Sequence, residues 1–108
     1  MIVDCHTHLK FDGAEYKTAE QLACDQSVDK CIILAGHQTS SDQANAAVSQ
    51  YINKYRDKLI GFAVVNPVEG RIDKSSVADL KDNLGLKGIV VYCSASGFHP
   101  CQRRAMQF

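Results

Sequence analysis

Two histidines near the amino terminus have the spacing of a metal-binding pair. His6 and His8 follow the apolar residues Ile2 and Val3 and are separated by one residue. Because side chains on a β-strand alternate between its two faces, the two imidazoles should point the same way. Neutral imidazole is a common ligand of zinc and suits related first-row metals. The pair therefore predicts a divalent metal site, with zinc favoured over manganese or iron. The alternative is a strand end that carries two solvated histidines.

Polar residues after the later apolar runs are candidates for contact with a small-molecule substrate. They are His37, which follows Gly36 directly, Asn66 and His99. Each has a simpler alternative, because a loop histidine can be solvated and an asparagine can cap a turn. Asp4 should share the face of the two histidines, and there a structural hydrogen bond is a better explanation than metal binding. The sequence identifies no catalytic base or nucleophile.

Short apolar runs alternate with helical segments along the whole chain. Strands are predicted over residues 2–4, 30–35, 59–65 and 88–92. The first two helices are predicted to follow Thr18 and Ser40, because each stands three residues before a glutamine in the form of a capping box. Gly85 should close a third helix, and Pro100 should open a fourth.

This alternation predicts an α/β fold with a parallel sheet and right-handed crossovers. Two architectures satisfy it: a small open doubly wound sheet, and a (βα)8 barrel, which needs about 250 residues. No glycine-rich phosphate-binding loop follows any predicted strand. Histidines at the end of the first strand favour the TIM-barrel type, whose enzymes carry their catalytic groups at the carboxyl ends of strands. Residues 1–108 are then expected to supply about four of eight strands, the amino-terminal half of a barrel, ending within the fourth helix.

Several strings in the chain resemble a known enzyme family. They are DCHTH at residues 4–8, GFAVVNP at 61–67, GLKGIVVY at 85–92 and GFHP at 97–100. Together they resemble the metal-dependent amidohydrolase superfamily. They are most similar to its amidohydrolase-related branch, which includes decarboxylases similar to aminocarboxymuconate-semialdehyde decarboxylase.

The resemblance implies a metal-dependent hydrolase of carbon–nitrogen or ester bonds, or a carboxy-lyase, in which His6 and His8 bind the metal. The family completes that site with a histidine from strand five, often one from strand six, and an aspartate from strand eight. The strand count places none of these within the 108 residues. The chain by itself is therefore expected to be inactive. The alternative is a non-catalytic remnant or an interaction module that needs a partner half, and the gene sequence past codon 108 would discriminate between the two.

The composition of the chain limits its expected cellular location and binding partners. Lysine plus arginine and aspartate plus glutamate number 12 each, so nothing steers the chain towards nucleic acid or an anionic membrane. No apolar run approaches the ~20 residues of a membrane span, and no secretory signal pattern opens the chain. The five cysteines form no CxxC pair, which favours reduced thiols. These features predict a cytoplasmic protein.

The predicted strand arrangement has one further consequence. Four parallel strands in an open sheet leave the first and the fourth without an outer neighbour, and such edges are templates for further pairing. The fourth predicted strand, residues 88–92, carries neither charge nor proline. Self-association through the open sheet edges is therefore expected.

Overall fold

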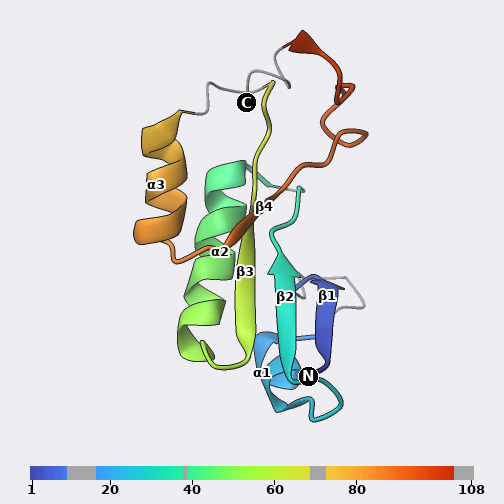
Figure 1. The fold of residues 1–108 in the computed structure, drawn as a ribbon, viewed down its shortest axis with the longest axis vertical. Coiled ribbons are helices and arrows are strands. Elements are labelled where there is room, and N and C mark those ends of the chain that lie inside the picture. Colours follow the sequence, from blue (N-terminus) through green and yellow to red (C-terminus); the bar gives the residue numbers. More distant parts are fainter. Residues whose placement is uncertain (10–16, 38, 69–72, 104–108) are drawn as a thin grey trace.

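The computed structural model describes residues 1–9, 17–37, 39–68 and 73–103. Within these residues, four parallel strands in the order β1-β2-β3-β4 alternate with three helices (Figure 1), so the predicted α/β fold is confirmed. The elements are β1 (Val3–Thr7), α1 (Ala19–Cys24), β2 (Lys30–Leu34), α2 (Ser41–Lys54), β3 (Leu59–Val64), α3 (Lys74–Asp82) and β4 (Gly88–Val90). No helix in the described part of the chain is long and apolar enough to cross a membrane.

All four strands differ from their predicted bounds: β2 and β3 end one residue early, and β1 and β4 differ by more. β1 continues through Thr7, which still pairs with β2, whereas the prediction ended it near Asp4. β4 stops at Val90, two residues before its predicted end, because its partner β3 ends at Val64. The predicted fourth helix falls mainly on residues 104–108, which lie outside the described part of the chain.

Side-chain caps fix where the helices begin. Thr18 and Gln21 form the predicted capping box, with Thr18 accepting the Gln21 N–H at 3.2 Å and donating its own N–H to the Gln21 side chain at 2.8 Å. The Ser40 hydroxyl caps α2. Asp73, which the sequence reasoning did not single out, caps α3 by accepting the Ser76 N–H at 2.9 Å. That bond and the hydroxyls of the first turn lower the pKa of Asp73 to about 2.

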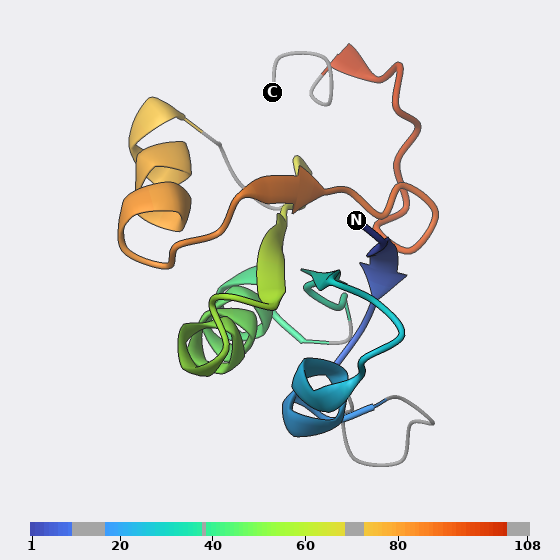
Figure 2. The ribbon, with the colours of Figure 1, turned by 60° about the horizontal axis from the view of Figure 1, so that its bottom comes forward.

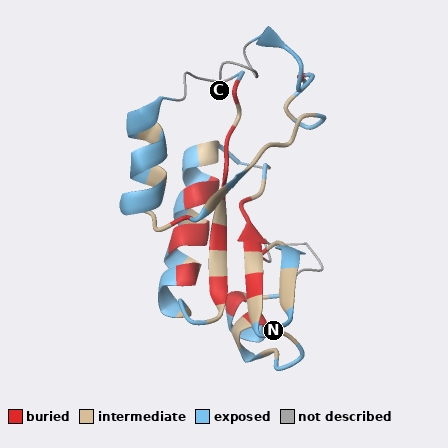
Figure 3. Cartoon of the chain, in the orientation of Figure 1, coloured by how far each residue is buried: buried red, intermediate tan, exposed pale blue. Residues whose placement is uncertain are grey.

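The three helices lie along one side of a curved sheet (Figure 2). Buried residues gather where α2 packs on the central strands (Figure 3). Ile33 of β2 pairs with Gly61 of β3, and both are buried on this helix-facing side. A Cβ atom at Gly61 would lie 2.7 Å from the Leu86 side chain and 2.9 Å from that of Val48, so only glycine permits this close approach.

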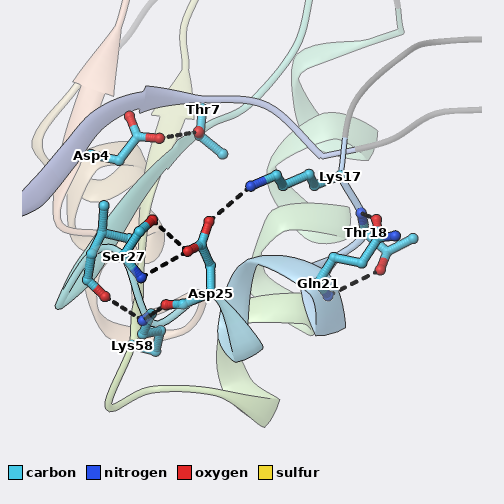
Figure 4. Close-up of polar contacts among 9 residues, drawn as sticks. Asp4, Thr7, Lys17, Thr18, Gln21, Asp25, Ser27 and Lys58 are labelled. Atoms are coloured by element: carbon cyan, nitrogen blue, oxygen red, sulfur yellow. Dashed lines mark hydrogen bonds and ion pairs between the residues drawn. The ribbon is translucent and has the colours of Figure 1, made fainter.

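A polar network joins the loops at the amino-terminal ends of the strands (Figure 4). The Asp25 carboxylate pairs with Lys17 at 2.8 Å and accepts the Ser27 N–H at 2.9 Å. The Lys17 bond is the largest cause that lowers the pKa of Asp25. Lys58, directly before β3, donates to the carbonyls of Asp25 and Val28 in the loop before β2. This end of the sheet is thus fixed by structural contacts.

A buried asparagine joins α2 to the carboxyl end of β3. Asn45 is 3 % exposed, and its side chain donates to the Val64 carbonyl at 3.0 Å and accepts the Val64 N–H at 2.8 Å. A backbone group in the core must have a partner, and here a side chain supplies both partners of one residue. Asn45 therefore fixes the position of the carboxyl end of β3 relative to α2.

Replacing this side chain should cost stability. Asn45→Ala leaves the N–H and the carbonyl of Val64 without their partners, and we expect the free energy of unfolding to fall by about 2–3 kcal/mol. Asn53→Ala, on the exposed last turn of the same helix, should change it by no more than about 0.5 kcal/mol. Urea unfolding followed by circular dichroism measures both. Equal effects of the two substitutions would contradict this role for Asn45.

Both ends of the sheet are edges. Within the described residues, β1 pairs only with β2, and β4 pairs only with β3. Ile89 of β4 is 38 % exposed, although it stands in the middle of its strand. An apolar, unpaired edge of this kind favours association with another strand.

We expect the 108-residue chain to self-associate at tens of micromolar concentration. Ile89→Lys places a charge on the β4 edge and should shift the average mass towards the monomer. Val77→Lys, at an equally exposed apolar position on α3, should not. Sedimentation equilibrium gives the masses. A wild-type chain that stays monomeric at every concentration would refute the expectation.

Candidate metal centre

A register irregularity in β1 decides which side chains face the candidate centre. Asp4 pairs with Cys31 and Thr7 pairs with Ile33, and both partners are buried on the helix-facing side of β2. Asp4 and Thr7 therefore share a face although they are three residues apart, which requires a bulge between them. Because neighbouring side chains alternate about Thr7, His6 and His8 lie on the opposite face, away from the helices.

The bulge corrects the expectation for Asp4. This residue does not share the face of the histidines. Its carboxylate accepts the Thr7 hydroxyl at 2.9 Å, as Figure 4 shows, and the His6 N–H at 3.1 Å. The structural hydrogen-bonding role predicted for Asp4 is thus present, and it stabilises the irregular segment that carries His6.

His6 and His8 converge on one point. Their Nε2 atoms are hydrogen-bonded to each other at 3.2 Å, with the rings edge to face at 69°. Two nitrogens bound to one tetrahedral zinc, at about 2.0–2.1 Å each, lie about 3.3 Å from each other. The imidazole pair therefore has the separation that one tetrahedral cation requires.

A backbone carbonyl sets the tautomer of His8. Its Nδ1 lies 3.1 Å from the Leu34 carbonyl oxygen at the end of β2. Because a carbonyl oxygen only accepts, Nδ1 carries the proton and Nε2 of the neutral ring keeps its lone pair. Metal-binding histidines are commonly oriented by such a contact.

The electrostatic surroundings keep His8 neutral. Burial is the largest cause that lowers the pKa of His8, the Leu34 bond opposes it, and charge on His6 or His37 lowers it further. Neutral imidazole is the form that binds a metal. Burial and the neighbouring imidazoles thus favour the form of His8 that a metal would require.

His37 and Tyr92 extend the cluster. The exposed His37 ring lies 4.9 Å from the Tyr92 ring, whose centroid is 6.4 Å from that of His8. The Tyr92 hydroxyl donates to the Ala35 carbonyl at 2.9 Å. The structure therefore brings His37 near the imidazole pair. Tyr92, for which the sequence left both a packing role and contact with the site open, joins the same group.

The two other predicted contact residues bond within their own loops. Asn66 accepts the Val68 N–H at 3.1 Å, which is the turn-capping alternative. His99 Nδ1 accepts the Cys101 N–H at 3.1 Å. Neither bond joins the imidazole pair, and substrate contact by Asn66 or His99 stays a prediction.

The described residues contain no group of three or more histidine, cysteine, aspartate or glutamate side chains placed to hold a metal ion. All five cysteines are free thiols. The imidazole pair thus offers two ligands, fewer than the three protein ligands usual for a catalytic zinc. Comparisons of the chain with models of protein families, with curated proteins and with solved structures find no match.

The lowered pKa of His8 predicts a pH dependence of stability. The unfolded imidazole has a pKa of 6.5, and the folded value is lower. Because the unfolded chain binds the His8 proton more strongly, neutral His8 contributes its full stabilisation above pH 6.5. This contribution is lost as the pH falls through the folded pKa of His8. His8→Gln should reduce this loss, and His99→Gln should not. Thermal unfolding at a series of pH values measures it, and parallel curves for wild type and His8→Gln would contradict it.

Proposed function

We propose that this chain carries the first metal ligands of an amidohydrolase-type enzyme, a metal-dependent hydrolase or decarboxylase acting on a small molecule. The observation that supports it most is the 3.2 Å separation of the His6 and His8 Nε2 atoms at the carboxyl end of β1. Zinc fits this pair best, with manganese or iron as alternatives. The family resemblance adds the proposed superfamily and the amidohydrolase-related branch.

The strand order supports a TIM-barrel-type architecture for the proposed enzyme. The doubly wound sheets that bind nucleotides reverse their order beside β1, which then lies inside the sheet. Here the order is sequential, and among the described residues β1 lies at an edge. The helices cover one side of a curved sheet (Figure 2), as the outer ring of a barrel does. Ile60 and Phe62 alternate along β3 with the helix-facing Gly61, so they lie on the inner side and would line the barrel interior.

The residues of this chain would have distinct tasks in such a site. His6 and His8 would hold the cation, and Leu34 would keep His8 in the binding tautomer. His37 stands where it would contact a substrate beside the pair. When bound, the cation would acidify a water or polarise a carbonyl. By the resemblance, further ligands and the proton-transfer group come from strands five, six and eight.

A second candidate function is a non-catalytic interaction module that needs a partner half. The observation that favours it is the two-ligand site, because the described residues supply no third ligand. Such a module would bind metal weakly alone and more tightly with a segment that adds ligands. Zinc affinity with and without the protein encoded downstream would separate the two candidates.

Metal binding tests the proposal directly. Dialysed to equilibrium against zinc, the protein should bind about one ion per chain, and a His6→Ala/His8→Ala variant should not, because a zinc site needs these imidazoles. His99→Ala is the matched control and should keep the ion. Elemental analysis of the two dialysis compartments gives the stoichiometry. Equal zinc in wild type and the double variant would refute the site.

The 108-residue chain alone should show little or no turnover of amide, lactone or carboxylate substrates. Removing even one catalytic group commonly costs several orders of magnitude, and here several are expected from other strands. Assays with added zinc measure this. Metal-dependent turnover that His6→Ala abolishes would show that the chain has a complete site.

A further inference from the structure

The end of β2 is held by hydrogen bonds from three segments. The Leu34 carbonyl accepts from His8 at 3.1 Å, the Ala35 N–H donates to the Phe62 carbonyl at 3.0 Å, and the Ala35 carbonyl accepts from Tyr92 at 2.9 Å. The first two bonds belong to one planar peptide group, and the third belongs to the next. The two peptides therefore share only the backbone torsions of Ala35.

Tyr92 reaches this segment from the far side of the sheet. It follows β4, 57 residues along the chain from Ala35. Its ring lies beside those of His37 and His8, while its hydroxyl donates to the Ala35 backbone carbonyl. Ala35 is 0 % exposed, so water is poorly placed to replace the hydroxyl as donor to its carbonyl.

Losing that donor would act on the neighbouring peptide. A buried carbonyl without a partner is costly and turns towards another donor. Turning the Ala35 carbonyl changes the torsions that this residue shares with the Leu34 carbonyl. The Leu34 carbonyl is what keeps the proton on His8 Nδ1.

We propose that Tyr92 is a positioning residue for the metal-binding imidazole. Its hydroxyl fixes the Ala35 carbonyl and thereby the Leu34 carbonyl, so that His8 keeps Nε2 unprotonated and directed at His6. The part of this inference that concerns metal affinity rests on the proposed function. The effect of Tyr92 on the His8 tautomer needs no metal, so an experiment can refute the proposed function and the role of Tyr92 separately.

The test compares Tyr92→Phe, which keeps the ring and removes the hydroxyl, with Tyr51→Phe, a partly buried tyrosine on α2. Nitrogen-15 NMR of the metal-free protein reports the His8 tautomer. We expect Nδ1–H in wild type and in Tyr51→Phe, and a mixture with Nε2–H in Tyr92→Phe. Competition with a chromogenic chelator measures zinc affinity. We expect it to be about tenfold weaker in Tyr92→Phe and unchanged in Tyr51→Phe, because loss of a residue that orients a metal ligand costs at least about tenfold in affinity.

An unchanged tautomer, or a changed tautomer with wild-type zinc affinity, in Tyr92→Phe would overturn the proposal. Replacing Tyr92 with 4-aminophenylalanine keeps the ring and offers a weaker N–H donor, so its tautomer ratio should lie between those of wild type and Tyr92→Phe. If Tyr92→Phe does not fold, an unchanged tautomer in this second variant overturns the proposal. A wild-type chain without zinc affinity would refute the proposed function, while the metal-free spectra would still decide the role of Tyr92.

Discussion

The peptide group between Leu34 and Ala35 joins the sheet to the candidate metal centre. Its N–H is bonded to β3 and its carbonyl to His8 beyond β1, so one rigid plane connects three neighbouring segments. Parallel pairing makes this possible, because it brings the carboxyl ends of successive strands to the same edge. The direction of the His8 ring thus follows from where β2 stops.

The Asp25 network and the candidate metal centre lie at opposite ends of the strands. The Asp25, Lys17 and Lys58 network lies at the amino-terminal end, where it ties loops to strands (Figure 4). Asn45 acts at the other end but behind the sheet, on the helix side. The imidazole pair and Tyr92 lie at the carboxyl ends of the strands. Substitutions at the amino-terminal end can therefore alter stability without touching the candidate centre.

Local signals in the sequence were sufficient for the element order and for the caps of α1 and α2. Alternation along a strand also led to two imidazoles on one side, and His6 and His8 do face each other. The face of Asp4 was wrong because a bulge depends on which partner residues pair with β1, and a single strand does not contain that information. The Asp73 cap had a visible signal, an aspartate three residues before Ser76.

Contacts between distant segments were beyond the sequence. The Tyr92 bond spans 57 residues and the His8–Leu34 bond spans 26, and both depend on where β4 and β2 end. The predicted β4 extended through Tyr92, which would have placed that side chain in the sheet. Because β4 ends at Val90, Tyr92 lies beyond the strand, and its hydroxyl bonds the Ala35 carbonyl.

The central claim is that His6 and His8 together bind one divalent cation. X-ray absorption at the zinc edge of the zinc-loaded chain measures this directly, because imidazole rings give a characteristic multiple-scattering pattern. We expect two imidazole nitrogens at about 2.0–2.1 Å from zinc, with oxygen completing the shell. A zinc shell with no imidazole, or one unchanged in the His6→Ala/His8→Ala variant, would contradict it.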